Sequence, residues 1–193
     1  MNILEVFIVG IHKVCSFFGH RKIKVSEELK ELVKSVVEDL IVNHNVQTFL
    51  FGSRSEFDNL CHSVVSELRE KYSNIKRIAY TCKSEVCILE SEREKWQEIY
   101  SHFHKEKVYL LAVEEEYEHK TKYDSGKASY VVRNQAMIRD SDFCVFYYDH
   151  NYQPTMRKCS KKSFGYYQPK SGTALAFACA KRKNKQIINI FDK

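Results

Sequence analysis

Three short motifs contain residue types that bind phosphate groups. Residues 19–21 read Gly-His-Arg, residues 52–58 read Gly-Ser-Arg-Ser-Glu-Phe-Asp, and residues 171–173 read Ser-Gly-Thr. Glycine lets backbone N–H groups approach a ligand closely, and arginine donates two parallel hydrogen bonds to a phosphate. One such motif is often an ordinary turn, whereas three that meet at one place indicate an anion-binding site.

A further segment adds polar residues from a predicted helix. Arg133 and Asn134 begin the sequence Arg-Asn-Gln-Ala-Met, and they either face the site or are ordinary helix residues. Asp58 is expected either to accept from a ribose hydroxyl or to stabilise the positive end of a helix dipole. The predicted donors to phosphate are the glycine backbones, the hydroxyls of the third motif and the arginines, while Asp58 or Asn134 contacts a ribose or base. The predicted ligand-binding residues are Gly19, His20, Arg21, Gly52, Ser53, Arg54, Asp58, Arg133, Asn134, Ser171, Gly172 and Thr173.

The apolar pattern of the chain predicts alternating strands and helices that position these motifs. Short apolar runs predict strands, and apolar residues three and four apart predict amphipathic helices. This alternation favours an α/β, Rossmann-like fold with a mostly parallel sheet and helices on both faces. We expect strands at residues 13–18, 46–51, 75–80, 108–113, 143–148 and 186–191, and helices at residues 26–41, 57–72, 91–103, 129–139 and 172–182.

The remaining segments are assigned by their composition. The acidic residues 114–118 predict a loop, and residues 1–10 predict an additional edge strand. No repeat or linker divides the chain, so residues 1–193 are expected to form a single domain. Ligands of such sheets bind beyond the carboxyl ends of the strands, which is where two of the three motifs begin and the third opens a helix.

Basic residues are concentrated near the end of the chain. Residues 150–193 contain ten Lys or Arg residues and one acid, a net charge of +9; because the whole chain carries +6, residues 1–149 carry −3. A basic segment suits a phosphate-bearing ligand or a nucleic-acid backbone, and it is also common on a solvated surface. Six glycines and two prolines exclude collagen-like, low-complexity and linker-rich architectures.

The cysteines and the hydropathy pattern predict a cytoplasmic protein. The apolar residues 1–11 lack the basic region and the small-residue cleavage site of a secretory signal. No run approaches the ~18 apolar residues of a membrane span, so no membrane partner is expected. The seven cysteines are therefore predicted to be reduced thiols. Cys82 and Cys87 have no second pair at zinc-binding spacing, so we expect no metal site.

Taken together, the motifs resemble the SLOG superfamily and, within it, the YpsA-like group. This superfamily joins the Smf or DNA-processing protein A family with the LOG cytokinin-activating phosphoribohydrolases. The resemblance spans about residues 13 to 190, and it implies a Rossmann-like sheet with a nucleotide-type ligand, but no other cofactor, at its carboxyl edge. By it, Arg133 corresponds to the arginine of the LOG Arg-Lys-x-x-Met motif. The matching residues are Cys-Ser-Phe-Phe-Gly-His-Arg (15–21), Gly-Ser-Arg…Asp (52–58), Arg-Asn-x-x-Met…Ser-Asp-Phe (133–143) and Ser-Gly-Thr (171–173).

One departure from the LOG pattern concerns catalysis. LOG enzymes carry a catalytic Glu three residues after the Thr of the last motif, and this chain has Ala176 there. Asn134 also stands where LOG enzymes have Lys. Because cleavage of an N-glycosidic bond needs a carboxylate, the candidate catalytic residues are Asp58 and Glu56. Whether the chain is an enzyme stays open.

A second departure is an insertion at about residues 149–170. LOG proteins pass almost directly from the preceding strand to the glycine motif. Aromatic side chains stack on bases and lysines meet phosphates, so the insertion is either a lid over a nucleotide or a disordered surface loop. It contains Tyr152, Phe164, Tyr166 and Tyr167 among Arg157, Lys158, Lys161 and Lys162.

Three hypotheses of function follow. The first is a sensor or regulatory protein that binds a nucleotide or a nucleotide-derived small molecule. The second is a nucleotide N-glycosidase of the LOG phosphoribohydrolase type. The third is a binder of single-stranded nucleic acid, which the basic residues 150–193 support and the acidic residues 1–149 oppose. Assembly into a homo-oligomer stays open in each case.

Overall fold

A six-stranded parallel sheet forms the centre of the computed structural model, which describes residues 12–52, 55–82, 88–92, 94–95, 112–118, 127–158, 166–167 and 169–192. The strand order is β10-β7-β1-β2-β3-β6, and each neighbouring pair is parallel. This architecture confirms the predicted Rossmann-like α/β fold. The strands are β1 (Lys13–Gly19), β2 (Val46–Phe51), β3 (Lys76–Thr81), β6 (Glu115–Glu118), β7 (Phe143–Tyr147) and β10 (Gln186–Asn189).

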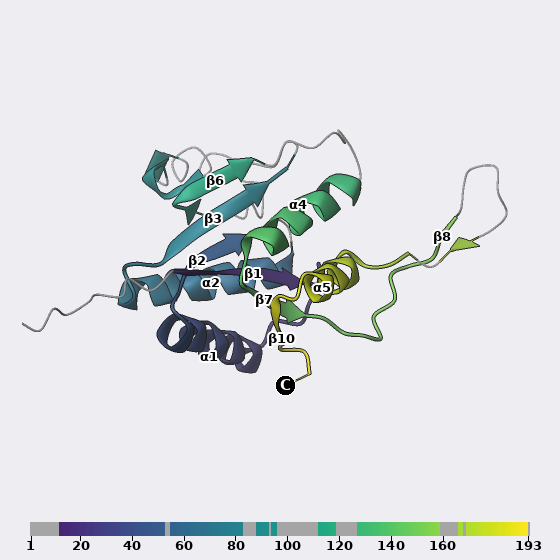
Figure 1. Ribbon diagram of the computed structural model, residues 1–193, viewed down its shortest axis with the longest axis horizontal. Helices are drawn as coiled ribbons and strands as arrows, with labels where there is room; N and C mark the ends of the chain where they lie inside the picture. Colours follow the sequence, from purple (N-terminus) through teal and green to yellow (C-terminus); the bar gives the residue numbers. More distant parts are fainter. Residues whose placement is uncertain are drawn as a thin grey trace, which may run out of the picture.

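In the described part of the chain, two helices cover each face of the sheet (Figure 1). Helices α1 (Glu27–His44) and α2 (Glu56–Lys71) pack on one face, and α4 (Lys127–Asp140) and α5 (Gly172–Arg182) pack on the other. Serines cap the N-termini of α1, α2 and α5. The side chains of Ser26, Ser55 and Ser171 accept hydrogen bonds from backbone N–H groups in the first turns of these helices. None of the helices in the described ranges is long and apolar enough to cross a membrane.

The two cores follow from the alternation of side chains along each strand. In β1, Phe17 packs with α1 and α2, whereas the next residue, Phe18, packs with α4 and α5. In β2, Phe51 packs with α1 and α2, and Leu50 packs with α4 and α5. Successive residues of a strand point to opposite faces, so a sheet covered on both faces requires nearly continuous apolar runs.

The prediction of a loop at residues 114–118 is wrong, because Glu115–Glu118 forms the edge strand β6. This strand pairs with β3, and the Thr81 hydroxyl donates to Glu116 at 2.7 Å. All four residues of β6 are exposed, and Lys76 pairs with Glu115. A charged edge strand buries little apolar surface and discourages pairing with other chains, which explains why it lacks the apolar pattern of the central strands.

The described end of the strand predicted at residues 108–113 is a strand, but it does not join the central sheet. Its described end, β5 (Ala112–Val113), pairs with β4 (Ile88–Leu89) in a separate two-stranded sheet. A 3₁₀ turn at Glu90–Glu92 stands near the predicted start of the helix at residues 91–103. Residues 96–103 and 108–111, and the predicted edge strand at residues 1–10, lie outside the described residues.

Part of the insertion forms a β-ribbon. Strands β8 (Arg157–Lys158) and β9 (Tyr166–Tyr167) pair antiparallel. The ribbon projects from the end of the molecule to which the central strands point (Figure 1). Two described parts of the insertion therefore pair with each other next to the carboxyl edge of the sheet.

Candidate ligand-binding site

The strand order places a crevice between the ends of β1 and β7. From β1 the chain adds β2, β3 and β6 on one side, and it then returns to add β7 and β10 on the other. The segments that follow β1 and β7 therefore leave in opposite directions, which opens a crevice at the carboxyl edge. A cavity of about 650 Å³ lies at this edge, lined by the end of β1, by residues that follow β2 and by residues that follow β7. This volume is within the range of roughly 300–1,000 Å³ that is usual for small-molecule sites.

The cavity brings together residues from all four predicted segments. They come from the end of β1, the start of α2, the middle of α4 and the start of α5. Ser53 and Arg54 lie outside the described residues. The candidate Glu56 uses its carboxylate to accept from the Ile23 backbone N–H at 2.8 Å. The predicted residues that line the cavity are Gly19, His20, Arg21, Gly52, Asp58, Arg133, Asn134, Ser171, Gly172 and Thr173.

Two helix N-termini open onto this cavity. The capping residues Ser55 of α2 and Ser171 of α5 both line it. A helix N-terminus carries a partial positive charge and N–H groups that favour an anion. The Thr173 hydroxyl donates to the carbonyl oxygen of Gly19 at 2.9 Å, so it joins the start of α5 to the end of β1. Thr173 therefore holds the two sides of the crevice together.

The three motif glycines differ in what a side chain at their positions would contact. A Cβ at Gly19 would overlap the Phe57 side chain of α2, so this glycine lets α2 pack against the end of β1. A Cβ at Gly52 would lie 3.0 Å from Cζ of Arg133, so this glycine makes room for the guanidinium. A Cβ at Gly172 would meet no atom within 4 Å, which leaves the start of α5 open toward the cavity.

Arg133 is held on the cavity wall by its helix neighbours. Only 5% of this residue is exposed. Its Nε and Nη2 donate to Oδ1 of Asn134 at 3.2 and 3.1 Å, and its Cζ lies 5.5 Å from the centre of the Tyr130 ring. The Asn134 oxygen therefore orients the guanidinium, a contact that differs from the ribose or base contact predicted for Asn134.

The described lining is strongly cationic. Arg21, Arg133, Arg157 and Lys170 contribute four positive charges, and Asp58 contributes one carboxylate. Asp58 is only 6% exposed and lies in the first turn of α2. Positive side chains and helix N-termini around one cavity select for an anionic ligand, because each group favours the same sign of charge.

His20 connects the end of β1 to the segment that follows β7. Its Nε2 accepts a hydrogen bond from the Asp149 backbone N–H at 3.1 Å, and its ring centre lies 4.2 Å from that of Tyr152. Burial lowers the pKa of His20, although the nearby Asp149 carboxylate opposes this shift. Because Nε2 accepts this hydrogen bond, it carries no proton, and the ring packs against Tyr152, which also lines the cavity.

Sequence reasoning missed part of the lining. Tyr130 is three residues before Arg133 on the same helix, and this spacing alone places both side chains on one face. Tyr152 and Arg157 stand in the aromatic and basic insertion, but their position over the cavity depends on the fold. The lining residues outside the list of predicted ligand-binding residues are Phe17, Phe18, Ser55, Tyr130, Tyr152, Pro154, Arg157, Pro169 and Lys170.

Comparison with known proteins gives one result that covers most of the chain. A family model described as the YspA SLOG family matches residues 11–178. A search of curated proteins finds no match.

Within the ranges that the structure describes, no three His, Cys, Asp or Glu residues are grouped so that they could hold a metal ion.

Proposed function

Because this chain belongs to the YspA SLOG family, we propose that it binds a nucleotide or nucleotide-derived anion and acts as a sensor or regulatory protein. The observation that carries this proposal is the convergence of two capped helix N-termini and a buried arginine on one cavity. Ser55, Ser171 and Arg133 come from three different helices and meet beyond the ends of the strands. Such an arrangement is suited to a phosphate group.

The same cavity offers surfaces for the rest of a nucleotide. Tyr130 and Tyr152 line it and supply aromatic rings for a base. Asp58 is the carboxylate among the described lining residues and supplies an acceptor for a ribose hydroxyl. In this proposal, phosphate lies against the helix N-termini and Arg133, and the sugar and base extend toward the tyrosines.

Titration calorimetry with the common mono- and diphosphate nucleotides tests the proposal. The test variant is Arg133→Gln, and the matched control is Arg139→Gln on the same helix, whose side chain is exposed and pairs with Asp140. Loss of a charged hydrogen bond to phosphate costs about 1.5–3 kcal/mol, so Arg133→Gln should weaken the best ligand roughly 10- to 150-fold. The Arg139→Gln control should bind like the parent protein.

Absence of nucleotide binding would contradict the proposal. If no nucleotide raises the midpoint of thermal unfolding, the cavity does not bind this ligand class, because binding to the native state stabilises it. Equal affinity of the two arginine variants would remove Arg133 from the site.

A second candidate function, hydrolysis of a nucleotide N-glycosidic bond, is favoured by the position of Asp58. This carboxylate is buried on the cavity wall, while Ala176 occupies the position of the LOG catalytic Glu. Release of free base from nucleoside monophosphates should then be measurable and should be lost in Asp58→Asn. Tight binding without base release would favour the sensor.

A further inference from the structure

The β8–β9 ribbon presents the same pair of chemical groups on each of its faces. Arg157 lies opposite Tyr167, and Lys158 lies opposite Tyr166. Residues directly opposite each other in an antiparallel pair have their side chains on the same face, and successive residues alternate. One face therefore carries Arg157 with Tyr167, and the other carries Lys158 with Tyr166.

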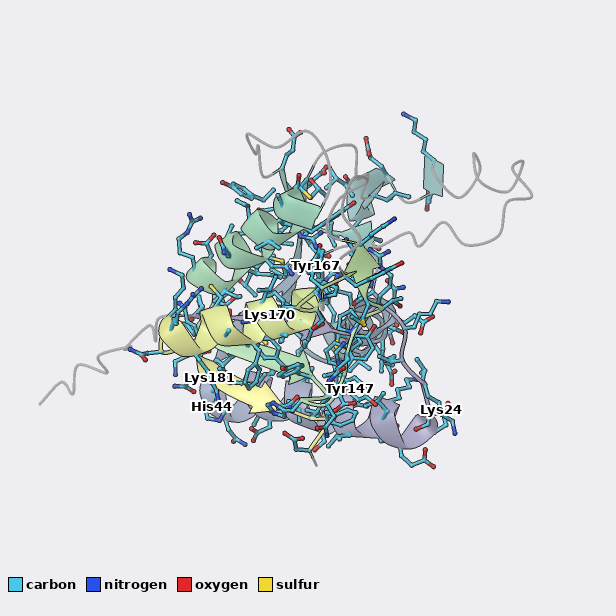
Figure 2. All side chains as sticks on the ribbon, turned by 90° about the vertical axis from the view of Figure 1, so that its right-hand side faces the viewer. Lys24, His44, Tyr147, Tyr167, Lys170 and Lys181 are labelled. Carbon is cyan, nitrogen blue, oxygen red and sulfur yellow. The ribbon has the colours of Figure 1, made fainter. Side chains whose placement is uncertain are left out.

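Only one of these faces continues the cavity. Arg157 lines the cavity, and Lys170, which also lines it, follows β9 closely in the chain. Tyr167 shares the face of Arg157 and is 46% exposed, whereas Tyr166 on the other face is 63% exposed. Figure 2 looks at the end of the molecule that carries the ribbon, and Tyr167 and Lys170 are both labelled on this side.

The charge of this region selects the kind of ligand. No Asp or Glu occurs between His150 and Phe191, so no acidic side chain of this segment compensates its cations. A second copy of the chain would bring a ribbon of the same positive charge, which disfavours pairing of two ribbons. An aromatic ring beside a cation is instead the combination that stacks a base and contacts its phosphate.

We propose that the ligand contains two nucleotide units joined through phosphate, with the first unit in the cavity and the second on the Arg157–Tyr167 face. This inference rests on the proposed function, since it places the first unit in the same cavity. The base of the second unit stacks on Tyr167, and Arg157 and Lys170 contact the linking phosphate. A free dinucleotide and the end of a single strand share this chemistry.

Fluorescence anisotropy or calorimetry with a length series tests the inference. The probes are the mononucleotide that binds best, its 5′-phosphorylated 3′–5′ dinucleotide and a six-nucleotide single strand of the same base. The variants are Tyr167→Ala and the matched Tyr166→Ala, both exposed on the same ribbon. Loss of one base–aromatic stack should weaken dinucleotide binding about 5- to 150-fold in Tyr167→Ala. Mononucleotide binding by Tyr167→Ala, and all binding by Tyr166→Ala, should equal that of the parent protein.

The outcomes separate the two proposals. If the dinucleotide binds no better than the mononucleotide, or if the two tyrosine variants behave alike, the second unit is wrong while the cavity proposal stands. If none of the three probes binds, the proposed function itself fails. An affinity that stops rising at two units indicates a free dinucleotide, whereas one that continues to rise at six indicates a single strand, and both support the inference.

Discussion

Two arginines are buried at different places in this molecule, and their surroundings differ. Arg77 of β3 is 3% exposed and Arg133 of α4 is 5% exposed. Arg77 donates to Glu114 at 2.6 and 3.1 Å, to Glu90 at 3.0 Å and to Ser66 at 2.7 Å. Arg133 is oriented by an amide oxygen and an aromatic ring on the wall of a cavity.

The contrast separates an arginine whose charge is paired within the fold from one that lines a cavity. We call Arg77, Glu114, Glu90 and Ser66 the Arg77 cluster. It joins β3 to α2, to the turn after β4 and to the residue between β5 and β6. Burial alone raises the pKa of Glu114, but hydrogen bonds from Arg77 lower it overall. The charge of Arg77 is therefore used within the fold, whereas Arg133 is placed where an anionic ligand can meet it.

The largest expected effect concerns the Arg77 cluster. Arg77→Met should lower the free energy of unfolding by about 3–5 kcal/mol, because it removes the four side-chain hydrogen bonds that the buried guanidinium donates to Ser66 and to the half-buried carboxylates of Glu114 and Glu90. Urea unfolding followed by circular dichroism measures this change. Arg133→Gln should cost clearly less stability. Equal losses in the two variants would break the distinction between a structural and a binding arginine.

The next effect is a pH dependence beside the same cluster. His62 Nε2 lies 2.9 Å from the Ala112 carbonyl oxygen, and burial lowers the pKa of His62 to about 4. An unfolded histidine titrates near 6.5, so below that pH the unfolded state binds a proton that the native state does not. Stability should fall as the pH drops from about 6.5 to 4, by a total of the order of 3 kcal/mol from this group.

A variant of His62 isolates this contribution. Glu114, whose pKa is lowered, also contributes stability that is lost as the pH falls through its folded pKa, so acid weakens the region through both groups. In His62→Gln the fall between pH 6.5 and 5 should flatten, because the amide can still donate to the Ala112 carbonyl and does not titrate. An unchanged pH profile would show that His62 is not the titrating group.

The motif glycines should differ in their effects on stability. Gly19→Ala should cost about 1–3 kcal/mol, because the added Cβ collides with Phe57. Gly172→Ala should change stability by no more than about 0.5 kcal/mol, since its Cβ would meet no neighbouring atom. Thermal or urea unfolding of the two variants compares them directly. A large loss in Gly172→Ala would mean that this glycine also packs against the fold.

The smallest expected effect is that of the surface ion pair on α4. Arg139 donates to Asp140 at 2.7 and 2.9 Å, but the Arg139 side chain is largely exposed. Arg139→Gln should change the free energy of unfolding by less than about 1 kcal/mol. Urea unfolding at low and high salt measures this term. A larger loss would mean that exposed pairs on α4 matter as much as the buried cluster.

Much of the fold was predictable, because buried strands and amphipathic helices leave regular patterns. The strands of the central sheet other than β6 carry the expected apolar runs, and the helix expected at residues 26–41 is α1, with Ser26 as its cap. The strand β6 was not predictable from this pattern. Its exposed Glu115–Glu118 pairs only with β3 at the edge of the sheet, so its conformation depends on a neighbour distant in the sequence.

The sequence predicted which segments form the candidate site, but it did not predict the contacts of their side chains. Motif residues at strand ends and helix starts were expected to meet at one edge, and ten of the predicted binding residues line the cavity there. The roles of individual side chains differ, because they depend on neighbours from other elements. Asn134 orients Arg133, His20 holds Asp149 and Tyr152, and Thr173 donates to Gly19.

The sequence by itself therefore determined the periodicity, the helix caps, the glycines and the basic end of the chain, since these are local properties of neighbouring residues. Only the tertiary structure decided which strand ends adjoin, because strand order is set by packing between distant segments. That order puts β1 between β2 and β7, so the end of β1 and the residues that follow β2 and β7 meet around the cavity. It also decided that one arginine is enclosed by carboxylates while another lines the cavity.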